Sequence, residues 1–153
     1  MELFEKQCSE LFISLGDHKK MVLSTSLHDK VSSRMMSLII LEDQFYFQTD
    51  HQFRKYEQIQ KNPNVSLCID NVQVEGICEE LGHTLDNPAF CELFRQHFPG
   101  SYELYTRLAN ERLFRITPVY MQKWIYENKK PFVEMFDFVN RRYQKEAYKE
   151  VAK

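Results

Sequence analysis

Three cationic side chains are the residues of this sequence whose types and spacing could bind an anion. Arg34 precedes an apolar run that ends in the polar turn 42–44, and Arg54 and Lys55 follow the aromatic segment after that turn. In an antiparallel hairpin, the first strand runs away from Arg34 and the second returns toward it. Cations that converge at one corner would hold a phosphate through charge-assisted hydrogen bonds, and the Thr49 hydroxyl could add another. The alternative is an ordinary hairpin with solvated surface cations.

The first strand of this hairpin, which begins with Arg34 to Leu38, could supply the other half of a ligand site. Backbone N–H and C=O groups along an open strand edge can pair with a heterocycle that alternates donors and acceptors. The hairpin therefore predicts a site for a flat, apolar ligand that carries a phosphate. No catalytic residue can be assigned beside it, because the sequence contains no GxSxG, GxGxxG or GxxxxGK[ST] motif.

Length and charge narrow the class of protein. The 153 residues fit one domain with its own core, so we expect a single domain over 1–153. The formal net charge of −2, with no block of like charges, gives no electrostatic basis for binding nucleic acid. No apolar run reaches the roughly 20 residues that span a bilayer, and no signal peptide is evident. We therefore expect no membrane partner and a cytoplasmic location.

Cysteines and histidines show no metal-binding pattern. The four cysteines form no CxxC pair, which favours reduced thiols in a cytoplasmic protein; they are Cys8, Cys68, Cys78 and Cys91. The five histidines have no HExxH arrangement, and a surface or core role is the commonest for such residues. The sequence therefore predicts no metal site.

Periodicity divides the chain into helices and strands. Apolar residues recur at helical spacing in an N-terminal helix within 1–16, at 53–61, 86–98 and 102–109, and in a helical C-terminal tail, 127–153. Alternating segments predict strands in both halves of the hairpin and at 20–27, 65–70, 72–81, 111–117 and 119–126. A polar connection is expected at 28–33, a bulge at Gly76 and a break at Pro118. Sequential antiparallel strands with aromatic faces close most easily into a small barrel, so the predicted fold is mainly β with flanking helices.

Short motifs around the hairpin occur in a distinctive order: RMMSL at 34–38, FQT at 47–49, Arg54-Lys55, NPNVSL at 62–67, and Gln73 with Gly76. Along roughly residues 18–126, this order and spacing resemble the pyridoxamine 5'-phosphate oxidase-like, FMN-binding split-barrel family. The resemblance implies a six-stranded antiparallel split β-barrel. It also implies a homodimer with FMN at the subunit interface.

The resemblance assigns roles to single residues as well. It implies that the FMN phosphate is held by Arg34, Arg54 and Lys55. The strand whose backbone lies along the flavin ring would be Met35, Met36, Ser37 and Leu38. A second flavin-contacting segment would be Gln48 and Thr49, and Gln73 would contact the ring system with its side chain.

One departure from the family pattern bears on activity. The RLHDR-type motif that binds the substrate in the oxidase itself is missing, and VYMQKWIYENKKP stands in its place. Authentic pyridoxamine 5'-phosphate oxidase activity is therefore not expected. In length and pattern the chain is similar to the smaller nitroimidazole-reductase-like and general-stress-like members.

Two functions remain open. The first is an FMN-dependent oxidoreductase for an unidentified small molecule, with pocket walls from Trp124 or Tyr120 of the partner subunit. Trp124 could equally pack in the subunit interface. The second is a non-catalytic module that binds FMN, another flavin or haem for storage or sensing.

Overall fold

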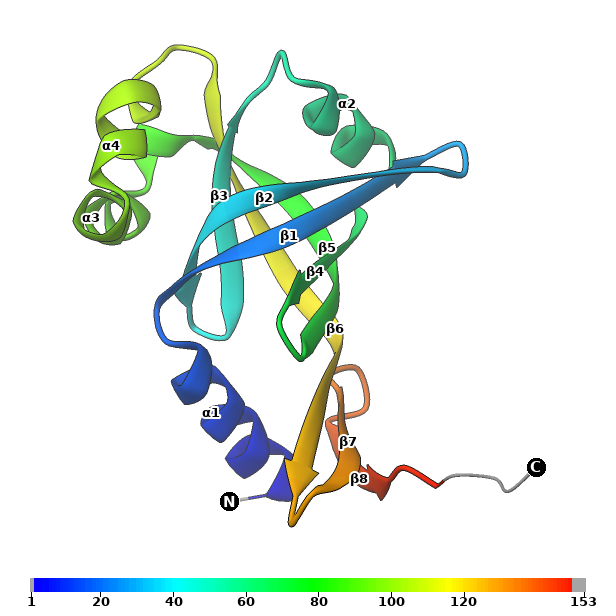
Figure 1. Ribbon diagram of the computed structural model, residues 1–153. Coiled ribbons are helices and arrows are strands. Elements are labelled where there is room, and N and C mark those ends of the chain that lie inside the picture. Colours follow the sequence, from blue (N-terminus) through cyan, green and yellow to red (C-terminus); the bar gives the residue numbers. More distant parts are fainter. Residues whose placement is uncertain (1, 150–153) are drawn as a thin grey trace.

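Six antiparallel strands close into a barrel in the computed structural model, which describes residues 2–149 (Figure 1). The strands are β1 (His18–Leu27), β2 (Lys30–Leu41), β3 (Gln44–Asp50), β4 (Asn64–Ile69), β5 (Val72–His83) and β6 (Glu111–Glu127). Their order is β3-β2-β1-β4-β5-β6, and β6 also pairs with β3, which closes the ring. The six-stranded antiparallel barrel predicted from the sequence is confirmed.

Helical segments lie outside this barrel (Figure 1). They are α1 (Leu3–Leu15), α2 (Arg54–Lys61), η1 (Thr84–Asp86), α3 (Pro88–His97), α4 (Pro99–Ser101) and the π-helical η2 (Tyr102–Thr106). α1 packs Phe4, Cys8 and Leu11 into the core and stops at Gly16, whose φ of +80° suits a glycine. The predicted helices in 1–16, 53–61 and 86–98 are therefore present. The short helix expected at 102–109 is instead the single π-helical segment η2.

The interior of the barrel is filled by alternate residues of its strands. In β3, Phe45 and Phe47 are fully buried and point inward, whereas their neighbours are only partly covered. A second, smaller cluster lies on the outer face, where Ile39 and Leu113 pack against Phe90 and Phe94 of α3. These contacts fix α3 and the segment after it against the outside of β2, β3 and β6.

β2 and β3 separate soon after their turn. They pair only through three residues on each strand, from Ile39↔Tyr46 to Leu41↔Gln44. Beyond Ile39, β2 continues toward Lys30 paired with β1 alone, while β3 pairs with β6 as far as Asp50↔Glu111. The barrel is therefore split between β2 and β3, and this opening positions the site described below.

The expected helical C-terminal tail is wrong. Residues Lys130–Asp137 form β7 and Arg142–Ala147 form β8, which continue the sheet outward from β6. Apolar residues at 132, 135 and 136 fit either period, and the open edge of the long β6 selects the strand. Asn128 and Lys129 form the two-residue turn with φ values of 51° and 66°. The last residues of the predicted tail, 150–153, lie outside the described part of the chain.

Two other expectations also need correction. The polar connection predicted at 28–33 is only the two-residue turn His28-Asp29, since β2 already begins at Lys30. Pro118 does not divide two strands but lies within β6, opposite Gly76. The predicted bulge is confirmed there, as the register shifts between Glu75 and Gly76. A Cβ at Gly76 would lie 2.6 Å from Cγ2 of Ile116, so the close approach of the two strands requires glycine.

Candidate functional site

A cleft of about 360 Å³ occupies the opening between β2 and β3. β2 contributes Met35, Met36 and Ser37, and β3 contributes Gln48 and Thr49, with Asp50 at its end. We call this cavity the β2–β3 cleft. Lys55 also lines the cleft. With it, six residues predicted from the sequence meet here: Met35, Met36, Ser37, Gln48, Thr49 and Lys55.

The β2 wall of the cleft presents unpaired backbone groups. Leu27 and Lys30 flank a two-residue turn, so they form a hydrogen-bonded pair. Because hydrogen-bonded pairs alternate along an antiparallel ladder, the even-numbered residues of β2 direct their N–H and C=O groups toward β1. The odd-numbered residues direct theirs to the other edge. Within residues 2–149, no strand pairs with that edge between Lys30 and Leu38. Met35 and Ser37 therefore offer backbone donors and acceptors to a ligand in the cleft.

Lys55 is held at the end of the cleft by the first turn of α2. Its Nζ donates to Oγ1 of Thr49 over 3.2 Å and lies 4.9 Å from the centre of the Phe53 ring. Burial is the main cause that lowers the pKa of Lys55, and the charge of Arg34 lowers it further. The ammonium group is thus partly desolvated and lies close to a second cation, an arrangement that an anion would stabilise.

Arg34 turns its guanidinium toward α2 rather than into the cleft. Nη1 donates to Oγ1 of Thr25 over 2.9 Å and to the Leu23 carbonyl over 3.3 Å, and Nη2 lies 3.4 Å from Oε1 of Gln58. Burial, and then the charge of Arg54, lower the pKa of Arg34. Arg54 and Lys55 are the first two residues of α2, and Arg34 contacts Gln58 one turn further along the same helix, so the three predicted cations lie around the first half of α2.

Besides Arg34, three predicted residues do not line the cleft. Leu38 is fully buried in the barrel core, so only its backbone belongs to the β2 wall. Arg54 is exposed at the first position of α2. Gln73 is exposed on β5, between Cys68 of β4 and Gln122 of β6, and the structure does not bring its side chain to the cleft of its own chain.

The sequence did not predict the wall opposite β2. It comes from Phe53 before α2 and from Phe94, Ser101, Tyr105 and Leu108 between α3 and β6. No local pattern placed these residues at the site, and the positions of Phe94 and of the lining residues after it depend on α3 packing against Ile39 and Leu113. Gln58 was also missed. It is buried within α2, where it accepts from Thr25 over 2.6 Å and its Nε2 donates to Oγ of Ser32 over 3.2 Å.

Glu111 was not predicted from the sequence either, and it is a buried acid that lines the cleft with Lys55. It begins β6 opposite Asp50. Burial, followed by the charge of Asp50, raises the pKa of Glu111 to about 7, against the opposing effect of Lys55. Its place on the same face of β6 as the buried Leu113 was the one available signal.

The Glu111 carboxyl predicts a pH-dependent stability. Its pKa in the folded state lies above the ordinary value of 4.5, so between pH 4.5 and 7 the folded chain keeps a proton that the unfolded chain releases. The stability that Glu111 contributes is thus lost as the pH rises through this window. We expect Glu111→Gln to raise the free energy of unfolding at pH 8 by on the order of 1–3 kcal/mol, and to change it little at pH 4.5.

Urea denaturation at the two pH values measures this difference. Glu103→Gln, which changes an exposed glutamate, serves as the control and is expected to behave like the unaltered protein at both. An equal gain at pH 4.5 and pH 8 would contradict the assignment, since it would not depend on ionisation of Glu111.

A larger cavity, of about 640 Å³, lies between α1 and the barrel and involves the β2–β3 turn. Among the described residues that line it, Arg141 is the only cation, and it forms an ion pair with Glu5 at 2.6 Å. This cavity therefore has no set of cations available for a phosphate, in contrast to the β2–β3 cleft.

Comparison with known families shows to which family the chain belongs. The family described as "Pyridoxamine 5'-phosphate oxidase" matches residues 5–125, which include the whole barrel except the end of β6. The chain belongs to the pyridoxamine 5'-phosphate oxidase family. No curated protein matches it significantly in sequence. No helix of the described residues is long and apolar enough to cross a membrane.

Solved structures share the split-barrel fold of this family. General Stress Protein 26 from Bacillus anthracis is 26% identical, with 79% of this chain and 92% of that chain covered and a TM-score of 0.57. A pyridoxamine 5'-phosphate oxidase-related, FMN-binding protein from Nostoc punctiforme is 17% identical, with 96% and 93% covered and a TM-score of 0.61. The haem storage protein HutZ from Vibrio cholerae is 14% identical, with 75% and 89% covered and a TM-score of 0.60.

Proposed function

We propose that this chain binds FMN in the β2–β3 cleft and acts as a flavin-dependent oxidoreductase on a small molecule. The observation that carries the proposal is the unpaired edge of β2, which ends beside three cations around the first half of α2. An isoalloxazine ring has hydrogen-bonding groups along one edge, and a phosphate ends its side chain. The cleft offers complementary groups for both parts.

The residues of the chain divide the binding between them. The backbone of Met35 and Ser37 would pair with the polar edge of the ring. Lys55 and Arg54 would hold the phosphate, with Thr49 orienting the Lys55 ammonium from 3.2 Å. Arg34 would contribute its charge without contacting the phosphate, because its guanidinium is held by Thr25 of β1 and Gln58 of α2.

FMN, when bound, would supply hydride or electron transfer, and the chain would supply binding and exclusion of water. The wall formed by Phe53, Phe94 and Leu108 would keep the cleft apolar around the ring. Glu111 is the lining carboxyl whose pKa lies near neutrality, but it adjoins Lys55 at the predicted phosphate end. Its role there is to limit the local positive charge, and we assign no proton transfer to it.

The described lining of the cleft favours a flavin over haem. It contains neither a histidine nor a cysteine, the side chains that most often bind haem iron. Haem is the second candidate only because the Vibrio cholerae neighbour, a haem storage protein, shares the fold. The purified protein should be yellow with flavin absorbance bands. A colourless protein that develops a sharp Soret band on addition of haem would contradict the FMN proposal.

A second copy of the chain would complete the site. Apolar side chains are exposed along the rim of the cleft, among them Met35 at 60%, Phe53 at 56% and Tyr105 at 50%. A homodimer would bury this rim, and it would allow Gln73 of the partner subunit to contact the flavin. Sedimentation at low micromolar concentration tests the proposal, and a monomer in the FMN-bound protein would overturn it.

We also propose a cytoplasmic location, because the four cysteines of the described chain are all free thiols. Cell fractionation of the native host tests it, and recovery of the protein in an oxidising compartment would contradict it.

A turnover measurement distinguishes an oxidoreductase from a flavin-binding module. The FMN-bound protein is photoreduced without oxygen, and reoxidation is then followed with nitroaromatics, quinones and NAD(P)+ as acceptors. We expect rapid reoxidation by at least one of these classes. Slow reoxidation by oxygen alone would favour a flavin storage or sensing module and reject the oxidoreductase.

A further inference from the structure

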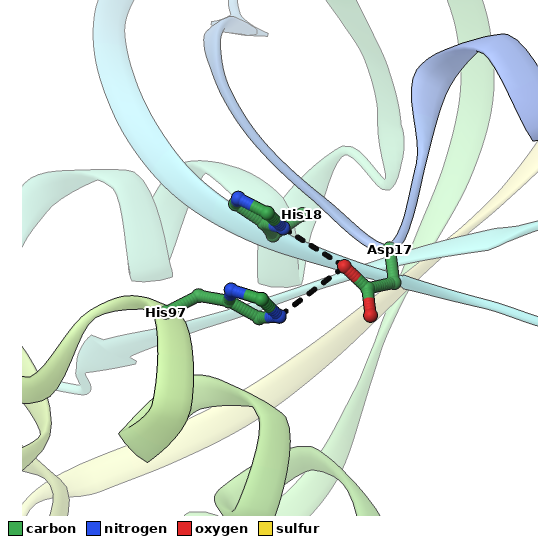
Figure 2. Close-up of side chains that lie close together, drawn as sticks. All are labelled: Asp17, His18 and His97. Atoms are coloured by element: carbon green, nitrogen blue, oxygen red, sulfur yellow. Dashed lines mark hydrogen bonds and ion pairs between the residues drawn. The ribbon is translucent and has the colours of Figure 1, made fainter.

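Two histidines and an aspartate meet away from the β2–β3 cleft, where the start of β1 meets the end of α3. Asp17 links α1 to β1, His18 is the first residue of β1, and His97 is the last residue of α3. Figure 2 shows both imidazole rings approaching the same carboxylate oxygen. One possible ligand atom from each residue lies within 4.8 Å of the other two.

One of the two contacts to Asp17 has the spacing of two ligands around a metal ion. Nδ1 of His18 is hydrogen-bonded to Oδ1 of Asp17 at 2.8 Å, and Nε2 of His97 lies 3.3 Å from the same oxygen. Two ligands of a tetrahedral zinc ion, each about 2.0–2.1 Å from the metal, are themselves about 3.3 Å apart. Two imidazoles and one carboxylate are also a ligand set typical of zinc and related divalent ions.

His97 has an unsatisfied polar atom. Its Nε2 is buried and can form an ion pair with Oδ1 of Asp17 at 3.3 Å when the ring is protonated, but among residues 2–149 it has no hydrogen-bond partner. A buried ring nitrogen without a partner is energetically unfavourable unless another group binds it. Asp17 and His18 are about half exposed, so an ion and its water ligands could reach the group from solvent.

The backbone around these residues is well fixed. The Ile40 amide donates to the Asp17 carbonyl over 2.8 Å, which joins the link before β1 to β2. The Phe98 amide donates to the Phe94 carbonyl at the end of α3, and the Phe98 ring lies edge-on to His18 at 6.0 Å. A metal ion would therefore join two elements whose positions are already set, which lowers the entropic penalty of binding.

We propose that Asp17, His18 and His97 form a binding site for a divalent transition-metal ion of the zinc class, with water completing its coordination. The inference is independent of the flavin proposal. The two rings are stacked, with centroids 3.7 Å apart and an angle of 10° between their planes. Their in-plane lone pairs cannot converge on one ion in that arrangement, so one ring must rotate. His18 has the room to do so, because its side chain is 45% exposed and that of His97 is 18% exposed.

Calorimetry with tag-free, chelator-treated protein tests the site, using Zn²⁺ as the probe and Mg²⁺ as the control ion. We expect one Zn²⁺ per chain and no binding of Mg²⁺, which prefers oxygen ligands. His97→Gln and Asp17→Asn should each weaken Zn²⁺ binding at least about tenfold, since each removes one protein ligand. His28→Asn, in the exposed β1–β2 turn, should leave it unchanged.

Two further readouts identify the ligands. Co²⁺ in place of Zn²⁺ should give visible absorption that is lost in His97→Gln, and Zn²⁺ should shift the ring NMR signals of His18 and His97 together. Circular dichroism verifies that each variant is folded, and Asp17→Asn provides an exposed substitution should His97→Gln fail to fold. Absence of Zn²⁺ binding, or equal binding in the folded variants, would overturn the proposal.

Discussion

Replacing Arg54 and Lys55 together by alanine is expected to weaken FMN binding by on the order of a hundredfold or more. Each charge-assisted hydrogen bond to the phosphate contributes about 1.5–3 kcal/mol, and two such losses correspond to at least that factor in Kd. The effect should be large because Lys55 is partly desolvated and close to Arg34, both of which destabilise its positive charge. A bound phosphate would stabilise that charge. Quenching of flavin fluorescence during titration of the apoprotein measures the affinity.

Two controls make this result specific to the phosphate. Riboflavin lacks the phosphate, so its affinity should change little in the double variant. Lys61→Ala alters a cation of the same helix that is 57% exposed and paired with Glu57 at 2.9 Å, and it should leave FMN binding unchanged. Full FMN affinity in the double variant would reject the phosphate assignment, whereas equal loss for FMN and riboflavin would indicate damage to the ring site.

Arg34 is less suitable for this test, although the sequence placed it first among the three cations. Its guanidinium donates to Thr25, and its removal would also leave the Gln58 and Leu23 acceptors with fewer donors. A loss of affinity in Arg34→Ala would therefore combine a missing charge with a rearranged α2. The sequence could place Arg34 near the corner, but the direction of its side chain depends on the register of β1 with β2 and on the packing of α2.

The parts of the site that were predictable have local causes. The turn after β2 and the Asn62-Pro63 stop after α2 depend on nearby residues only, so the hairpin and its helix could be located from the sequence. The cations and Thr49 then followed from spacing along these elements. The same reasoning predicted the bulge at Gly76, where the sequence signal and the 2.6 Å approach of Ile116 agree.

The parts that were not predictable depend on contacts distant in sequence. The helical prediction for the C-terminal tail was wrong because Phe132 and Phe136 satisfy a helical period, while pairing with β6 decides for strands. Tyr105 and Leu108 reach the cleft only because α3 packs on the outside of the barrel. His18 and His97 likewise come together through the topology, and no spacing in the sequence indicates it.

Phe114→Ala is expected to lower the free energy of unfolding by about 3–5 kcal/mol, as removal of a buried aromatic ring usually does. Phe114 is fully buried in β6, where it stacks on Phe47 of β3 at 5.2 Å. Tyr56 of α2 contacts it edge-on at 5.7 Å. The loss would be a large share of the 5–15 kcal/mol typical of a folded domain. Urea denaturation measures it directly.

The same substitution should also weaken FMN binding, because Phe114 supports the helix that begins with Arg54 and Lys55. Phe136→Ala is the matched control: that ring is equally buried, but it lies on β7 and packs against Tyr143. We expect similar losses of stability in the two variants and a loss of FMN affinity in Phe114→Ala alone, measured where both are fully folded. An FMN affinity of Phe114→Ala equal to that of Phe136→Ala would show that α2 keeps its position without Phe114. The hydrogen bond from the Tyr56 hydroxyl to Glu80, at 2.9 Å, would then suffice to hold the cations in place.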